Sequence, residues 1–339
     1  MWAMITKEMR QMRRDRRTLA MMIVMPVMLL VVFGYAASFD VATINVAVTG
    51  QEGSAVGSML PEPFHLIESS RTDPEEILRH NDADVAISVS GGEATAYIDG
   101  AELFTARAAV QAFTAAAEQG VPVTMEVLFN PELATSAVLV PGLAGLVLLF
   151  IGSLVTSLGV VRERQTGTLE QLAVMPFTAR DVFVGKIGPY FVVAAIDLVV
   201  VLAVGRLLFD VPFRGSIALL SLGALLFLFV TLGTGVLISM VSQNQGQAIQ
   251  LALMTLLPQV LLSGIIFPLE SMAAGVRWIG YLLPLTYFNQ IARGVMLRGA
   301  PLSAVALPLS LLAILGVVVF GLAVLAFRRQ LAPAKTVPA

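Results

Sequence analysis

Cysteine is absent from the 339 residues, which excludes disulfide bonds, thiolate metal sites and cysteine nucleophiles. Histidine is scarce: His65 and His80 are too few for a histidine metal cluster, and we interpret both as solvated surface residues. Charged residues make up only 13% of the chain, against ~25% in typical soluble proteins. With a net charge of −2, the chain as a whole shows no electrostatic footprint for nucleic acid.

Apolar residues are correspondingly in excess, at 57% of the chain with a mean hydropathy of +0.85. A helix needs about 20 mostly apolar residues to cross the hydrocarbon core of a bilayer. Six stretches qualify and predict a polytopic α-helical membrane protein with six transmembrane helices: Leu19–Phe39, Ala137–Val161, Gly188–Phe209, Ile217–Val241, Gln247–Phe267 and Leu307–Phe327. A cleaved signal peptide is the alternative for the first stretch, but its length and the preceding basic residues favour an uncleaved anchor.

Lys and Arg are distributed unevenly between the two sides of the predicted membrane. Six precede the first span, four lie between the second and third, and three follow the last, 13 in all against eight on the other side. Both termini, including the tail 328–339, are therefore predicted to be cytoplasmic. Within residues 1–18, Trp2, Ile5 and Met9 recur at helical spacing among the basic residues. This pattern predicts an amphipathic helix against lipid headgroups, with a disordered basic tail as the alternative.

Residues 40–136 form a polar insert between the first two spans, with 15 acidic residues and three basic ones. Local patterns predict strands and helices in alternation, and hence an extracytoplasmic α/β domain. The predicted strands are Ile44–Val48, Asp84–Val89 and Ala94–Ile98, and the predicted helices are Ser54–Leu60, Pro74–His80 and Leu103–Gln119. The acidity suits cations or basic partners, although charge runs are more often solvated faces, which we favour.

The connection between the second and third spans is the richest polar stretch in the membrane half of the chain. Thr168 followed by Gln171 is a capping box, which predicts a short helix from Leu169 that stops before Pro176. The arrangement repeats ten residues later, ahead of a second helical turn at Val182–Val184. A capped, charged helix suits a docking surface for a cytosolic partner, and a simple connector is equally compatible.

Asp197 lies within the third predicted span, where a carboxylate is costly and is a candidate for the translocation path. It could bind a cationic substrate group, be protonated, or hold helices together. A direct pair with Arg206 within the helix is disfavoured, because nine residues span about 13 Å.

Prolines and glycines interrupt the fifth predicted span, and the segment 268–300 after it is too polar to cross the membrane fully. Its aromatic residues, such as Trp278 and Tyr281, predict short interfacial or re-entrant helices at the outer face. Such helices could form an exit gate or a structural plug.

No phosphate-binding loop is visible in the sequence. Gly185–Lys186 is followed by Ile187 rather than Ser or Thr, and the upstream glycine spacing of a P-loop is missing. We therefore expect that this chain does not hydrolyse ATP by itself and is not an enzyme.

Five motifs resemble the ABC-2 type permeases, the membrane subunits of a class of ABC exporters. Residues 162–172 are similar to the cytoplasmic loop of that family. The other motifs follow in the family's order: Lys7–Glu8 with Arg14–Arg17, Pro26 with Phe33–Ala36, Phe129–Leu133 with Val140–Gly142, and Leu262–Gly264 with Phe267–Pro268 and Pro284–Tyr287.

The resemblance implies that the segment 162–187 holds a coupling helix that sits in a groove of a cytoplasmic ABC ATPase. By position, the coupling residues would be Arg162, Glu163, Arg164, Gln165, Thr166, Gly167, Thr168, Leu169, Glu170, Gln171 and Leu172. ATP and magnesium would bind that partner, leaving no cofactor on this chain. A second permease chain would complete the transporter, and a periplasmic adaptor is a further possible partner. The implied function is export of a hydrophobic drug, lipid or similar substrate across the bacterial inner membrane.

Two other classes of protein fit parts of the sequence. An ion-coupled secondary transporter would explain Asp197, but no inverted repeat is evident. A membrane sensor or scaffold would use the insert to bind a ligand, but no predicted cytoplasmic segment is long enough for a signalling domain.

Overall fold

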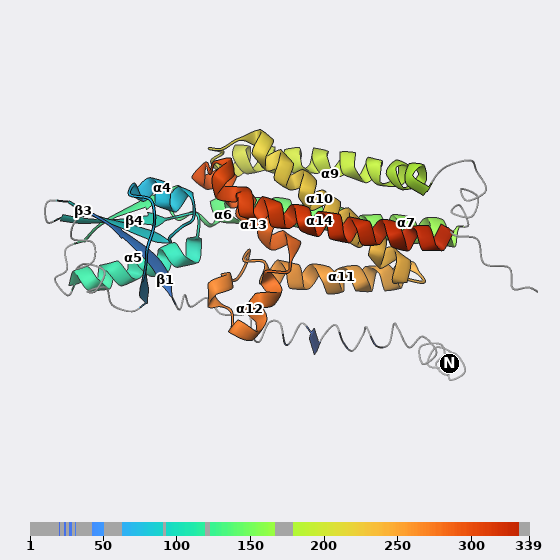
Figure 1. Ribbon diagram of the computed structural model, residues 1–339, viewed down its shortest axis with the longest axis horizontal. Coiled ribbons are helices and arrows are strands. Elements are labelled where there is room, and N and C mark those ends of the chain that lie inside the picture. The colour runs from blue at the N-terminus through green and yellow to red at the C-terminus, as the bar shows by residue number, and fades with distance from the viewer. Residues whose placement is uncertain are drawn as a thin grey trace, which may run out of the picture.

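The computed structural model describes residues 43–50, 63–90, 93–118, 123–166 and 179–331, with isolated helical positions at 20, 24, 27, 28 and 31. These residues form an α/β part at one end of the long axis and a helical bundle along the rest (Figure 1). The predicted interfacial helix 1–18, nearly all of the first span, the predicted helix Ser54–Leu60 and the tail from residue 332 lie outside the described residues.

The α/β part contains a five-stranded mixed sheet in the order β2-β1-β3-β4-β5. Its strands are β1 Ile44–Thr49, β2 Phe64–Ile67, β3 Val85–Ser90, β4 Glu93–Asp99 and β5 Val123–Leu128. β1 runs parallel to both β2 and β3, β3 and β4 form an antiparallel hairpin, and β5 runs parallel to β4. Neither β2 nor β5 was expected from the sequence.

Alternation along the strands directs side chains to two separate cores, one on each face of the sheet. Val85 and Ile87 pack with α5 (Leu103–Glu118), while Ala86 between them packs with α4 (Pro74–Arg79). The helices therefore cover opposite faces of the sheet. Asp73 caps α4 by accepting a hydrogen bond from the Glu75 N–H, which fixes where that helix begins.

The bundle is built from long apolar helices and several short ones. Its elements are α6 Thr135–Leu149, η1 Phe150–Val155, α7 Thr156–Gln165, α9 Ala179–Phe209, α10 Ile217–Val241, α11 Gln245–Leu262, η2 Leu269–Ser271, α12 Ala274–Gly280, α13 Pro284–Arg293, η3 Gly294–Arg298 and α14 Leu302–Leu331. Among the described residues, four helices are long and apolar enough to cross a membrane: Thr135–Gln165, Gly188–Phe209, Ile217–Val241 and Leu302–Ala326.

The first of these spans is continuous from Thr135 to Gln165 and contains a π-helical turn, η1, at its middle. Small residues allow η1 and α10 to approach closely. A Cβ on Gly152 would lie 2.0 Å from the Thr231 hydroxyl oxygen, and one on Gly235 would lie 2.5 Å from the Gly152 carbonyl oxygen. Close helix contact through small residues is the usual packing solution in a bilayer, because lipid offers no hydrophobic drive for helix association.

Several boundaries differ from those expected, and two of the differences change how a segment is assigned. α9 begins at Ala179 and continues through Val182–Val184 into the span, so those residues are part of a long helix rather than a separate turn. α11 ends at Leu262, five residues before the predicted end at Phe267, and Gly264 follows with a φ of +81°. The chain then forms the short helices η2, α12 and α13 in place of a longer fifth span.

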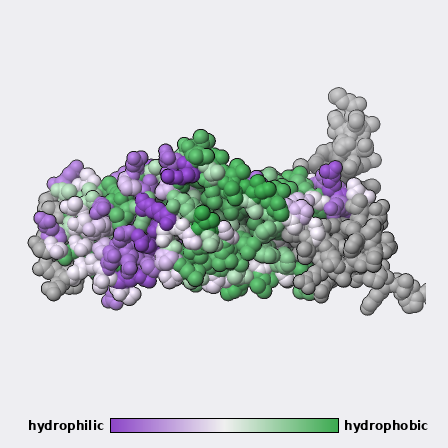
Figure 2. Space-filling model, turned by 90° about the horizontal axis from the view of Figure 1, so that it is seen from above, coloured by the Kyte–Doolittle hydropathy of each residue, from purple (hydrophilic) through white to green (hydrophobic). Residues whose placement is uncertain are grey.

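Exposed apolar side chains cover the outer helices of the bundle. On α9 they include Val192, Ile196, Val199 and Leu207, and on α14 they include Leu307, Val317 and Leu322. Figure 2 shows hydrophobic residues over the bundle and hydrophilic residues gathered over the α/β part. An apolar surface of this extent is expected of a protein in contact with lipid.

Candidate functional site

The polar end of α7 lies at the end of the bundle away from the α/β part (Figure 1). Here Arg162 and Gln165 are exposed, while Glu163 and Arg164 are half-buried. Thr166 ends the helix: its N–H donates to the Arg162 carbonyl oxygen at 3.0 Å, and its hydroxyl donates to the Glu163 carbonyl oxygen at 3.1 Å. The first five predicted coupling residues therefore form the end of the long apolar helix Thr135–Gln165 and its cap.

The turn between α10 and α11 packs beside this end of α7. The Arg164 guanidinium donates to the Ser242 carbonyl oxygen, and the Gln245 amide donates to Gln165 Oε1 at 3.1 Å. Asn244 caps α11 by accepting from the Gln247 N–H at 2.9 Å. No local residue pattern predicts that this uncharged turn, 78 residues from Arg164, packs against the coupling segment.

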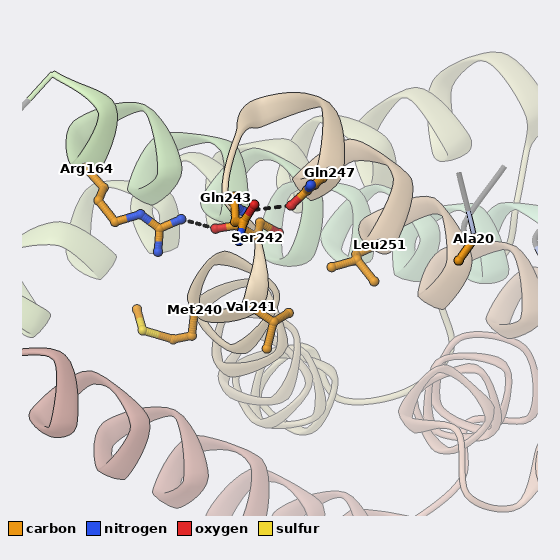
Figure 3. A pocket seen from close by; sticks show the side chains of 8 residues that line it. All are labelled: Ala20, Arg164, Met240, Val241, Ser242, Gln243, Gln247 and Leu251. Atoms are coloured by element: carbon orange, nitrogen blue, oxygen red, sulfur yellow. Dashed lines mark hydrogen bonds between the residues drawn. The ribbon is translucent and has the colours of Figure 1, made fainter. Parts of the chain in front are cut away.

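A pocket of about 850 Å³ opens between these elements (Figure 3). Arg164 and the amides of Gln243 and Gln247 provide its polar groups, and Leu251 and Met240 are among its apolar ones. The Gln243 N–H donates to Gln247 Oε1 at 2.9 Å, which holds the turn against α11. The arrangement offers hydrogen-bond donors and a cation at the end of the bundle.

The remaining predicted coupling residues, Gly167, Thr168, Leu169, Glu170, Gln171 and Leu172, lie outside the described residues, as does Pro176.

Asp197 is half-buried on α9, next to Ile196, which is 57% exposed. Within the described part of the chain, the Asp197 carboxylate forms no ion pair or hydrogen bond, either with Arg206 or with another residue. The structure therefore does not bring Asp197 together with the coupling residues. The helix on which Asp197 lies has mostly exposed or half-buried side chains.

The α/β part is joined to the short helices by buried ion pairs that the sequence analysis did not anticipate. Arg298 on η3 contacts Asp99 at 2.7 Å and Glu102 at 3.2 Å, and Arg293 on α13 contacts Glu102 at 2.9 Å. Arg293 also donates to the Gly264 carbonyl oxygen at 3.0 Å. Burial raises the pKa of the Asp99 carboxyl, and the Arg298 guanidinium opposes this shift.

The motif Phe129–Leu133 forms the covalent joint between β5 and α6. Asn130 is 5% exposed, and its amide donates to the carbonyl oxygens of Gly100 and Ala134, both at 3.2 Å. Its Oδ1 accepts from the Ala134 N–H at 3.0 Å. A single side chain thus ties the end of the sheet to the beginning of the first described span.

Comparisons with known proteins bear on this architecture. The family described as ABC-2 family transporter protein matches residues 16–325. The chain is 30% identical to a probable multidrug ABC transporter permease, YbhS of Escherichia coli, over 88% of each chain. It is 26% identical to the probable multidrug ABC transporter permease YbhR of the same organism, over 90% of this chain and 92% of the relative. A third relative, the inner membrane transport permease YhhJ of Escherichia coli, is 35% identical over 52% of this chain and 47% of its own.

These matches confirm the resemblance seen in the motifs, and they favour a permease over a secondary transporter or a sensor. Membrane subunits of this kind are non-catalytic and depend on a partner ATPase, often alongside a second permease. The match over 16–325 includes both the bundle and the α/β part. The chain belongs to the ABC-2 family of transporter proteins.

Proposed function

We propose that this chain is the permease of an ABC exporter with six membrane spans, which moves a hydrophobic drug or lipid-like compound outward across the bacterial inner membrane. Two relatives are named as probable multidrug permeases, which supports this substrate class. The driving force is ATP hydrolysis on a separate ABC ATPase, which would bind ATP and magnesium.

The observation that carries the proposal is the unbroken helix from Thr135 to Gln165. One end carries Arg162–Thr166, and the other follows the joint made by Asn130. A helix of 31 residues is about 46 Å long, so a displacement at its polar end reaches the far side of the bilayer. We assign Arg162–Leu172 to ATPase coupling on this ground and on family likeness.

Orientation follows from the charge distribution. The end of α7 is cytoplasmic in this proposal, as are both termini, and the α/β domain 40–136 is extracytoplasmic. The short helices of 268–300 then lie at the outer face beneath the domain. The exposed apolar faces of the bundle contact a second permease chain. An adaptor, where one exists, binds the α/β domain.

Co-purification with a candidate ABC ATPase tests the coupling assignment. We expect Arg162→Glu, a charge reversal at an exposed position, to reduce ATPase retention at least tenfold. A matched control is Glu126→Arg, a charge reversal at an exposed position on β5, which should retain the ATPase. Equal retention by both variants would remove the coupling role from the end of α7.

A transport assay tests the exporter class itself. We expect liposomes that hold the chain with its ATPase to move a fluorescent hydrophobic dye when ATP is supplied on the ATPase side. Liposomes that hold the chain alone should show no transport driven by an ion gradient. Gradient-driven transport by the chain alone would overturn the proposal and make Asp197 the centre of the mechanism.

A further inference from the structure

A small cavity of about 80 Å³ lies where the α/β part meets the short helices of the bundle. Asp84 and Glu102 line it from the α/β part, and Ser263, Glu270 and Asn289 line it from the bundle. A water molecule occupies about 30 Å³ in the liquid, so the cavity has room for one small ion and a hydrating water.

The groups around the cavity carry more negative than positive charge. Arg293 and Arg298 are its two guanidinium groups, and both are engaged with Asp99 and Glu102. Asp84 and Glu270 form no ion pair with any described residue. Among the described residues, the Asp84 carboxylate accepts a hydrogen bond only from the Asn45 N–H, at 2.8 Å. Two carboxylates therefore lack a cationic partner in the described part of the chain.

Two buried oxygen atoms in the wall also lack partners. Ser263 is 1% exposed and Asn289 is 3% exposed, and neither Ser263 Oγ nor Asn289 Oδ1 has a hydrogen-bond partner among the described residues. Buried polar atoms of native proteins are almost always satisfied, so two unpaired oxygens beside one cavity indicate an occupant. Arg293 Nε is an unpaired donor nearby, which a water beside the occupant could satisfy.

We propose that this cavity binds one small monovalent cation, an alkali-metal ion or a primary ammonium group, through Asp84, Asn289 and Ser263. A divalent ion such as Ca²⁺ takes six to eight oxygen ligands, usually with several carboxylates. The described residues contain no group of three or more His, Cys, Asp or Glu side chains that could hold a metal ion. Few carboxylates combined with neutral oxygens suit a single positive charge better.

Asp84 lies among other carboxylates. Burial raises the pKa of Asp84 to about 7, helped by the neighbouring carboxylates of Glu102, Glu270 and Asp99 and opposed by the Asn45 hydrogen bond. The other charged groups at the cavity are Arg293 and Arg298. A cation in the cavity would offset the repulsion among these carboxylates.

The site also joins two parts of the protein. Asp84 immediately precedes β3, Ser263 caps α11, and Asn289 lies on α13. A bound cation therefore stabilises the contact between the α/β part and the bundle.

Thermal unfolding of the full chain in detergent, at constant ionic strength, tests the proposal. The buffer cation is N-methylglucamine, which is too large for the cavity, and sodium, potassium, ammonium or methylammonium chloride replaces it. We expect a saturable rise in Tm at pH 8 for at least one of these small cations. If alkali-metal ions raise Tm and methylammonium does not, the ligand is an inorganic ion. If methylammonium raises Tm and alkali-metal ions do not, the ligand is an ammonium group.

Variants separate the site from general salt effects. Asp84→Asn should abolish the saturable rise, and the control Glu75→Gln, on the exposed face of α4, should keep it. Ser263→Ala removes an unpaired oxygen, so it should leave Tm unchanged or higher without small cations, yet weaken their effect at least tenfold. The proposal is overturned if no small cation acts saturably, if only divalent ions act, or if Ser263→Ala responds as the wild type does.

Discussion

Arg298 on η3 and Asp99 at the end of β4 form an ion pair of 2.7 Å, although 199 residues separate them. Their side chains are 4% and 1% exposed, so the pair is almost fully removed from solvent. The pair holds the α/β part against the bundle. The covalent connection between these two parts, at Asn130, lies 168 residues before Arg298 in the chain.

Loss of one partner in this pair should be costly. Arg298→Met leaves Asp99 buried without its cation, and we expect unfolding to be easier by about 3–5 kcal/mol. The double variant Asp99→Asn with Arg298→Met should recover much of that loss, because no charge is then left unpaired. Denaturant unfolding in detergent measures both.

The exposed pair of Arg79 and Glu75 provides the control for this prediction. It is an i,i+4 pair on α4, so Arg79→Ala should change stability by less than about 1 kcal/mol. Equal losses for the buried and the exposed pair would contradict the role assigned to burial.

A methyl group at Gly152 should disturb the centre of the bundle. Its Cβ would meet the Thr231 side chain at 2.0 Å, so Gly152→Ala is expected to cost about 1–3 kcal/mol. Gly321→Ala on α14 is the matched control, because its Cβ would meet no atom within 4 Å. A melting temperature for Gly152→Ala as high as that of Gly321→Ala would argue against close contact between η1 and α10.

The raised pKa of Asp84, about 7, gives the stability a pH dependence. Between about pH 4 and pH 7 the folded chain binds more protons at this carboxyl than the unfolded chain does. Its contribution to stability is therefore largest at low pH and is lost as the pH rises through 7. With N-methylglucamine as the only cation, Asp84→Asn should flatten this part of the Tm profile. A wild-type profile that rises across the same range, and that Asp84→Asn leaves unchanged, would contradict the assignment.

Asp197→Asn tests whether this residue belongs to the translocation path. We expect the folded yield to stay unchanged, since a neutral amide is less costly than a carboxylate at membrane depth. Efflux of a cationic dye should fall at least tenfold if the carboxylate binds the cationic group. Ile196→Asn, on the adjacent exposed position, should leave efflux intact. Unchanged efflux in Asp197→Asn would leave a structural role instead.

Regular, buried elements of this chain could be predicted from its residues, and edge elements could not. The ranges expected for the strands at Ile44, Asp84 and Ala94 differ by at most one residue at each end from β1, β3 and β4, whose alternating side chains fill two cores. β2 and β5 are the edge strands of the sheet. Their side chains are mostly exposed or half-buried, so they lack the apolar pattern on which strand prediction depends.

Helix ends and long-range contacts were hidden for different reasons. Hydropathy indicates which part of a helix lipid can surround, and it does not indicate where the backbone hydrogen bonds of the helix end. The polar first turns of α9, before Gly188, are therefore predicted as a connection although they are helical. The polar stretch at Arg162–Thr166 was visible as a candidate site from its charge and position. Its partner turn at Ser242 and the pairs of Arg293 and Arg298 depend on tertiary packing that no local pattern records.

Because of the π-helical turn η1, the helix Thr135–Gln165 tolerates a change of length better at its middle than elsewhere. A π-turn closes on the fifth residue back instead of the fourth, so it holds one residue more than the α-helix on either side of it. Removal of one residue from Phe150–Val155 can therefore be absorbed by reversion to plain α-helix, with both ends of the span kept in phase. The same deletion in α6 or α7 would rotate Arg162–Thr166 by about 100° relative to Asn130. The midpoint of this helix is thus the one place where evolution could shorten the connection between its two ends without turning one against the other.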